Sequence, residues 1–179
     1  MNSAKSTQNK PTFGRYGKSF QEGLVQLIYQ DRPFADQITE VLDLNFLELE
    51  YLRVFTDKIT SYRDKYSKHP SANALATILK TELDSEEAVI QQQVKEYFTR
   101  ITTGELDNEE YIKEKSLDFC RKQNLKEAML QSVGLLESSS FDEISKVINE
   151  SLKLGSETNF GHDFIADFEA RYQPRHRQP

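Results

Sequence analysis

Apolar side chains recur every three to four residues along almost the whole of this 179-residue sequence, and nowhere do they alternate strictly with polar ones. A period near 3.6 is typical of amphipathic α-helices, whereas a half-buried β-strand has a period of two. The clearest run is Leu52, Phe55, Ile59, Tyr62 and Tyr66, at steps of 3, 4, 3 and 4. The pattern therefore predicts an all-α protein.

Helix start and stop signals accompany these stripes. Four pairs of residues have the spacing of a capping box, in which a side chain at the helix start and an acid three residues later bond to free backbone N–H groups. Ser71 predicts the N-cap of a further helix, Pro33 suits the first turn of another, and Pro70 ends the stripe before it. We therefore expect an orthogonal helical bundle of about six to seven helices, followed by a linker and a short detached amphipathic helix. The four pairs are Asn45 with Glu48, Asp84 with Glu87, Asp107 with Glu110, and Ser140 with Glu143.

Changes in composition divide the chain into five segments. Residues 1–18 are polar and lack apolar periodicity, which predicts a disordered basic tail. The helical domain is expected over residues 19–154, and the Gly-, Ser- and Asn-rich residues 155–162 are typical of a linker. A short stripe then predicts a helix over 163–173, and 174–179 are interpreted as the start of a connection to a further domain.

Charge is distributed unevenly along the chain. The sequence holds 23 Lys and Arg against 29 Asp and Glu, a formal net charge of −6, yet residues 1–18 and 171–179 contain no acid. Residues 19–170 therefore carry 16 bases and all 29 acids, a balance of −13. Because phosphate binding needs a basic face, this composition argues against a sequence-specific DNA-binding protein.

The cysteine count and the hydropathy pattern bear on location. A single cysteine excludes a disulfide framework and a cysteine-based zinc site, and it suits the reducing cytoplasm. No apolar run approaches the ~20 residues that cross a bilayer, so we expect a cytoplasmic protein with no membrane contact. Cys120 itself lies on an apolar stripe and is interpreted as a small core residue.

A GKS tripeptide near the N-terminus resembles the end of a phosphate-binding loop. Such a loop needs G-x-x-x-x-G-K-[ST] after a buried strand, so that backbone N–H groups surround the phosphates. Here only two residues separate Gly14 from Gly17, and Thr12 stands where the first glycine should be. We therefore interpret residues 14–19 as a lead-in to the first helix rather than as a nucleotide site.

The remaining polar residues do not form a catalytic or metal-binding pattern. His69, His162 and His176 are scattered and have no ligand partner at helical spacing. Asp163 and Asp167 are four residues apart, but that face offers neither a histidine nor a third carboxylate. The sequence thus predicts no catalytic, metal-binding or cofactor-binding residue in this chain.

The predicted helix over residues 163–173 carries an aromatic stripe of its own. Phe164, Phe168 and Tyr172 are spaced i, i+4 and i+8, with Ile165 beside them. A helix of roughly 10 residues is unstable alone, and aromatic anchors on one face are typical of a helix that docks into a groove. We therefore predict that these four residues dock on a partner; the alternative is that they fold back on the parent bundle.

Residues 161–172, with the sequence GHDFIADFEARY, resemble the linker-helix signature of replicative DNA helicases of T-even-type phages, within the hexameric DnaB-like helicases. The preceding bundle is similar to the N-terminal domain of those helicases in its first helix, FQEGLVQLIYQ, in the pair Asn45-Phe46 that opens a long helix, and in the YSKHPS that closes it. The resemblance covers residues 19–179. The further positions of the signature are Gly161, His162, Asp163, Asp167, Glu169, Ala170 and Arg171.

This resemblance implies that the chain is the N-terminal assembly and partner-docking domain of a hexameric, ATP-dependent 5′–3′ replicative helicase. In that family the N-terminal domains pair between subunits into a collar and meet primase and the helicase loader. The linker helix packs on the motor domain of the neighbouring subunit. It also implies that single-stranded DNA is contacted only through the parent protein, that ATP and Mg²⁺ bind in its motor domain, and that the cytoplasm is that of a phage host.

A motor domain is expected soon after Pro179 and is not in this sequence. We interpret the chain either as a fragment of a longer helicase or as the product of a gene truncated there, and in both cases expect it not to hydrolyse ATP. A second class of function stays open. A free-standing helical adaptor, such as a helicase loader or a collar mimic, would use Phe164, Phe168 and Tyr172 to hold a helicase.

Overall fold

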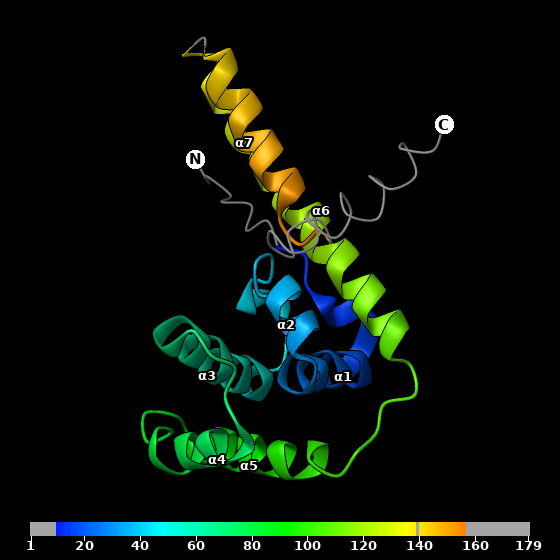
Figure 1. Cartoon of the computed structure of the whole chain (residues 1–179), viewed down its shortest axis with the longest axis vertical. Coiled ribbons are helices and arrows are strands. Elements are labelled where there is room, and N and C mark those ends of the chain that lie inside the picture. The colour runs from blue at the N-terminus through cyan, green and yellow to red at the C-terminus, as the bar shows by residue number, and fades with distance from the viewer. Residues whose placement is uncertain (1–9, 139, 157–179) are drawn as a thin grey trace, which may run out of the picture. The chain divides into compact units, whose positions relative to one another are not determined.

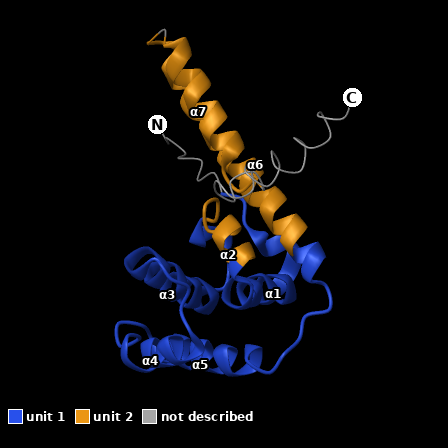
Figure 2. Cartoon of the chain, in the orientation of Figure 1, with its two compact units in different colours: residues 1–32, 43–112 blue, residues 33–42, 113–179 orange. Residues whose placement is uncertain are grey.

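A computed structural model of the chain describes residues 10–138 and 140–156 (Figure 1). In these ranges the protein has seven α-helices and two short 3₁₀ helices and contains no β-strand, so the predicted all-α class is confirmed. The contacts divide the chain into two compact units, as Figure 2 shows. Unit 1 comprises residues up to 32 together with 43–112, and unit 2 comprises 33–42 together with the residues from 113 onward.

Unit 1 contains six of the helical elements completely. Its elements are the 3₁₀ helix η1 (Phe13–Tyr16), α1 (Gly17–Gln30), the 3₁₀ helix η2 (Leu44–Phe46), α3 (Glu50–Tyr66), α4 (Ala72–Thr81) and α5 (Ala88–Ile101). Unit 2 contains most of α2 (Arg32–Ile38), most of α6 (Glu109–Leu136) and all of α7 (Phe141–Lys153).

The core of unit 1 forms around Phe55 of α3, whose side chain is completely buried. The ring of Tyr97 from α5 meets it edge-on, with the centroids 5.3 Å apart at an angle of 90°. Tyr29 of α1 and Phe98 of α5 contact the same ring at 6.2 and 6.1 Å. The apolar stripes that predict α1, α3 and α5 therefore meet in one aromatic cluster, in the edge-on and tilted geometries that aromatic pairs prefer.

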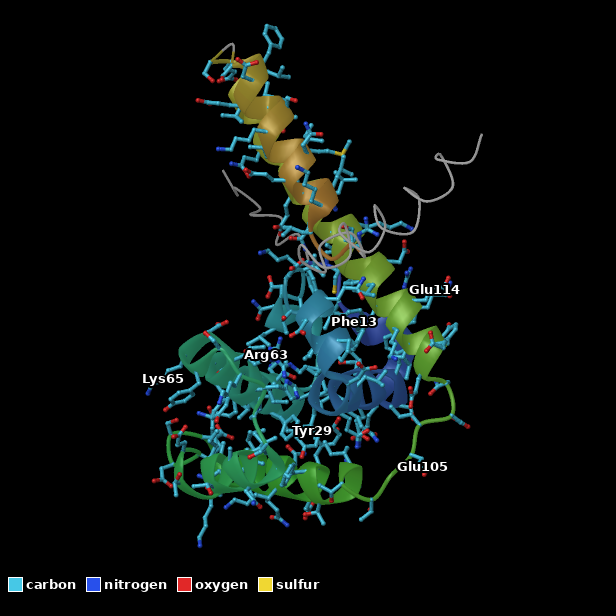
Figure 3. All side chains as sticks on the ribbon, viewed as in Figure 1. Phe13, Tyr29, Arg63, Lys65, Glu105 and Glu114 are labelled. Atoms are coloured by element: carbon cyan, nitrogen blue, oxygen red, sulfur yellow. The ribbon has the colours of Figure 1, made fainter. Side chains whose placement is uncertain are left out.

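The prediction of a disordered tail through residue 18 is wrong from residue 10 onward. Phe13, labelled in Figure 3, is completely buried. Its ring meets that of Phe46 edge-on, with the centroids 6.1 Å apart. Thr12 Oγ1 donates a hydrogen bond to Glu48 Oε1 at 2.8 Å and accepts one from the N–H of Gly14 at 3.1 Å. One phenylalanine within a polar run creates no periodicity, so the sequence pattern does not reveal this anchor. Residues 1–9 lie outside the described part of the chain.

The predicted caps have mixed outcomes. Ser71 is the N-cap of α4, and its Oγ accepts a hydrogen bond from the N–H of Ala74 at 3.1 Å, as predicted. The pair Asn45 with Glu48 does not open α3, which begins at Glu50; Asn45 lies inside η2, whose N-cap is Asp43. The predicted capping box thus fails because Asp43 caps a separate 3₁₀ turn.

The later capping boxes also differ from expectation. Glu87, rather than Asp84, is the N-cap of α5, and it makes no side-chain capping bond. Ser140 is the N-cap residue of α7, as expected, but makes no such bond either. Acidic side chains do occupy the first turns of α6 and α7, where they favour the helix dipole.

In unit 2 the helices α6 and α7 form an antiparallel pair, which we call the hairpin. The two helices are joined by residues 137–140, and Arg121 Nη2 lies 3.5 Å from the carbonyl oxygen of Leu152, so α7 runs back along α6 (Figure 1). α6 continues unbroken through Gly134 for 28 residues. No helix in the described ranges is long and apolar enough to cross a membrane.

Candidate docking surface

Along residues 121–153, where α6 and α7 pair, the most buried positions carry small side chains, while Ile144, Val147 and Ile148 of α7 are half-buried. Ala128 and Ser132, one turn apart on α6, are 7% and 6% exposed, and Ser132 Oγ donates to the carbonyl of Ala128 at 2.7 Å. On α7 the buried position is Ser151, at 9% exposure. Small residues let two helices approach closely, but they bury little apolar area. The large apolar residues of α6 are therefore free to point elsewhere.

Those large residues form an exposed apolar strip, defined as Met129, Leu130, Val133, Leu136 and Phe141. Their side chains are respectively 55%, 63%, 62%, 58% and 78% exposed. The first four share one side of α6, since spacings of three, four and seven residues repeat along one helix face. Phe141 is the first residue of α7 and follows them after the turn. The strip thus extends along the distal half of the hairpin.

An exposed strip of large apolar side chains is informative, because side chains of this kind are usually buried. Single exposed apolar residues are normal, whereas a contiguous patch of large ones marks an interaction surface or a liability to aggregate. The positions around the strip are charged and exposed, as the rim of a protein interface is. These rim residues are Lys126, Glu127, Glu137, Asp142 and Glu143.

A pocket of about 160 Å³ lies toward the opposite end of the hairpin. A cavity of about 150 Å³ is large enough to hold benzene, so this pocket has room for one aromatic ring. On its rim Lys122 Nζ is paired with Asp118 Oδ2 at 2.8 Å. The residues that line it are Asp118, Arg121, Lys122, Leu125, Ser151 and Leu152. The hairpin therefore offers a partner both an apolar strip and a recess.

A polar cluster around Glu22 in unit 1 joins α1 to α3 and α5 by hydrogen bonds. The Glu22 carboxylate accepts hydrogen bonds at Oε1 from Tyr51 Oη at 2.5 Å and from Arg100 Nη2 at 2.8 Å. Tyr97 Oη donates to the backbone carbonyl of Glu22. Burial, followed by the negative charge of Glu22, raises the pKa of Tyr97, and burial with the Glu22 hydrogen bond raises the pKa of Tyr51. Both hydroxyls remain protonated donors at neutral pH.

The histidine and cysteine in the described residues have structural positions, as interpreted from sequence. His69 bonds at Nδ1 with Arg63 and at Nε2 with the carbonyl of Tyr29. The thiol of Cys120 is completely buried. Among the described residues no group of three or more His, Cys, Asp or Glu is placed to hold a metal ion.

The GKS segment forms helix rather than a phosphate-binding loop. Residues 13–16 make the turn η1, and Gly17 opens α1 with φ of +84°. A Cβ on Gly14 would lie 2.0 Å from Glu48 Oε1, so this glycine allows the Glu48 carboxylate to approach the backbone. Gly14 therefore serves the packing of the N-terminal turn.

The docking residues predicted from sequence, Phe164, Ile165, Phe168 and Tyr172, lie outside the described residues, as do all seven further positions of the linker-helix signature. The apolar strip was not predicted. The signal that could have found it is the pairing of large apolar residues on one side of α6 with Ala128 and Ser132 on the other.

No family model matches the chain, and a search of curated proteins finds no significant match.

Proposed function

We propose that this chain is an assembly and partner-docking domain, specifically the N-terminal collar domain and linker helix of a hexameric, ATP-dependent 5′–3′ replicative DNA helicase. The observation that supports docking most strongly is the apolar strip on the hairpin. A second copy of the chain is the proposed partner for the strip, because pairing between identical strips buries all five side chains at once. Such isologous pairing is the commonest route to a symmetric oligomer.

The chemistry of the described residues agrees with binding rather than turnover. The ionised and hydroxyl groups of the Glu22 cluster bond to one another, and the strip is apolar with a charged rim. In the proposed parent protein ATP and Mg²⁺ bind in a motor domain, and primase and the helicase loader are further proposed partners. The specific assignment to a helicase is motivated by the likeness of residues 161–172 to the linker helix of that family.

Two experiments test the helicase assignment. The reading frame beyond codon 179 should encode a strand followed by G-x-x-x-x-G-K-[ST] within several dozen codons. In the parent protein, Phe168→Ala should weaken ring assembly by about 2 kcal/mol or more while leaving the melting of residues 1–179 almost unchanged. A natural stop codon at 180 with no motor gene nearby would instead favour a free-standing loader or collar mimic, which should bind a preassembled helicase hexamer in a pull-down.

A further inference from the structure

Gly155 lies just after helix α7, and side chains from the α2 region form hydrogen bonds with both its N–H and its carbonyl. Gly155 follows the helix with φ of +67°, the left-handed conformation that commonly terminates an α-helix. In the usual motif the N–H of this residue bonds back to a carbonyl of the last helical turn. Here the N–H donates to Glu40 Oε2 at 3.0 Å, while the Gly155 carbonyl accepts from Gln37 Nε2 at 2.8 Å.

The packing around Gly155 is tight as well as specific. A Cβ added to this residue would lie 3.1 Å from Val41 Cγ1 and 3.3 Å from Arg121 Cγ. Val41 itself is only 3% exposed. A side chain at position 155 would therefore be strained both by the positive φ and by its neighbours. Gly155 therefore fits a narrow space bounded by Val41 and Arg121, which lie far away in the sequence.

The same segment is also tied to α6. Asn124 Nδ2 donates to the carbonyl of Val41 at 2.8 Å and to the carbonyl of Cys120, one turn earlier on its own helix, at 2.9 Å. Together with the Gln37 and Glu40 bonds, this contact joins the α2 region, α6 and the end of α7 within unit 2. Every group in these four hydrogen bonds except the Glu40 carboxylate is a backbone atom or a side-chain amide, so the connection does not rely on an exposed ion pair.

We infer that residues 33–42 act as a strap that holds the end of α7 and keeps its last turn wound. With the strap closed, α7 stays helical through Lys153 and Gly155 is held, nine positions before Phe164 in the sequence. If the strap opens, the last turn of α7 can unwind, and each residue released adds up to about 3.3 Å of reach. Four residues would add about 13 Å. That longer reach would let the linker helix dock farther away, a consequence that rests on the proposed function.

Limited trypsin digestion of the full chain tests the strap, because Lys153 lies in the last turn of α7 and Lys146 lies near its middle. In Gln37→Ala/Glu40→Ala, cleavage after Lys153 should accelerate by about tenfold or more, since two hydrogen bonds to the helix end are lost. Cleavage after Lys146 should keep its wild-type rate. Glu40→Gln retains an oxygen acceptor and should keep most of the wild-type protection against cleavage after Lys153. Asp142→Ala, in the first turn of α7, is the matched control for loss of a carboxylate.

Unchanged cleavage after Lys153 in the double alanine variant would show that the strap does not hold the end of α7. Equal acceleration after Lys146 and Lys153 would also overturn the inference, because the hairpin would then open as a whole. Both readouts use the chain alone, so they are independent of whether it assembles with a motor domain.

Discussion

The guanidinium of Arg63 lies 2.8 Å from the imidazole of His69, between Nη1 and Nδ1. The other ring nitrogen of His69, Nε2, lies 2.6 Å from the carbonyl oxygen of Tyr29. A guanidinium can only donate and a carbonyl can only accept, so the ring is neutral with its proton on Nε2. His69, directly before Pro70, thereby connects the last turn of α3 to the last turn of α1. Its two partners, Arg63 and Tyr29, are labelled in Figure 3.

Replacing His69 by alanine should lower the free energy of unfolding by about 1–3 kcal/mol, because the Tyr29 carbonyl and the Arg63 guanidinium each lose a partly buried partner. Urea denaturation followed by circular dichroism measures the change. Lys68→Ala, at the exposed neighbouring position, is the control and should stay within about 0.5 kcal/mol of wild type. A His69→Ala change as small as that of the control would show that the ring contributes nothing.

The raised pKa values of the Tyr97 and Tyr51 hydroxyls predict that the protein loses stability at alkaline pH. Their pKa values are raised above the ordinary value of 10.0 by burial and by Glu22. Above about pH 10 the unfolded chain releases these protons while the folded chain keeps them, so the folded state binds more protons. The free energy of unfolding should therefore fall as pH rises through this range, and should be unaffected by these groups below it.

Urea denaturation between pH 8 and 11, at about half-unit steps, measures this slope. Tyr51→Phe should make the slope shallower. Leu75→Ala is the control, because it removes a completely buried side chain, lowers stability without removing a titrating group and should leave the slope unchanged. An identical slope in wild type and Tyr51→Phe would contradict the role given to the buried hydroxyl.

Two phenylalanines provide a contrast between core and docking surface. Phe55→Ala should cost about 3–5 kcal/mol, since a completely buried ring is removed and a cavity is left. Phe141→Ala, at 78% exposure, should change the stability of the monomer by less than about 0.5 kcal/mol. Thermal or chemical unfolding at low protein concentration distinguishes the two. A change below about 1 kcal/mol for Phe55→Ala would place that stripe at the surface instead.

The sequence predicts the helices well because each buries one stripe at helical period. Leu52, Phe55 and Ile59 lie on the clearest predicted stripe and are completely buried. Phe13 escapes prediction because a single apolar residue has no period. Gly155 is interpreted from composition as the first residue of a linker, yet Gln37 and Glu40 fix it from more than a hundred positions away. Such long-range bonds leave no local pattern.

The candidate site is harder to predict than the fold. A helical period in the sequence does not say whether an apolar stripe faces the same chain or another one. In the structure Met129 is 55% exposed, because the most buried positions of this part of α6 are Ala128 and Ser132. A search for large apolar residues does not find them. The predicted face at Phe164, Phe168 and Tyr172 stays a prediction, since it lies outside the described residues.

The central claim is that the apolar strip is an assembly surface, and the mass of the chain in solution tests it most directly. One chain has a mass of 20.8 kDa. Sedimentation equilibrium from about 1 to 100 μM should give a dimer or larger species for the wild type. Leu130→Asp/Val133→Asp should give a folded monomer, because two charges would be buried unpaired on association. Gln131→Asp, an exposed neighbour, should assemble like the wild type. A wild-type chain that stays at 20.8 kDa throughout, or an aspartate pair that leaves the mass unchanged, would contradict the account.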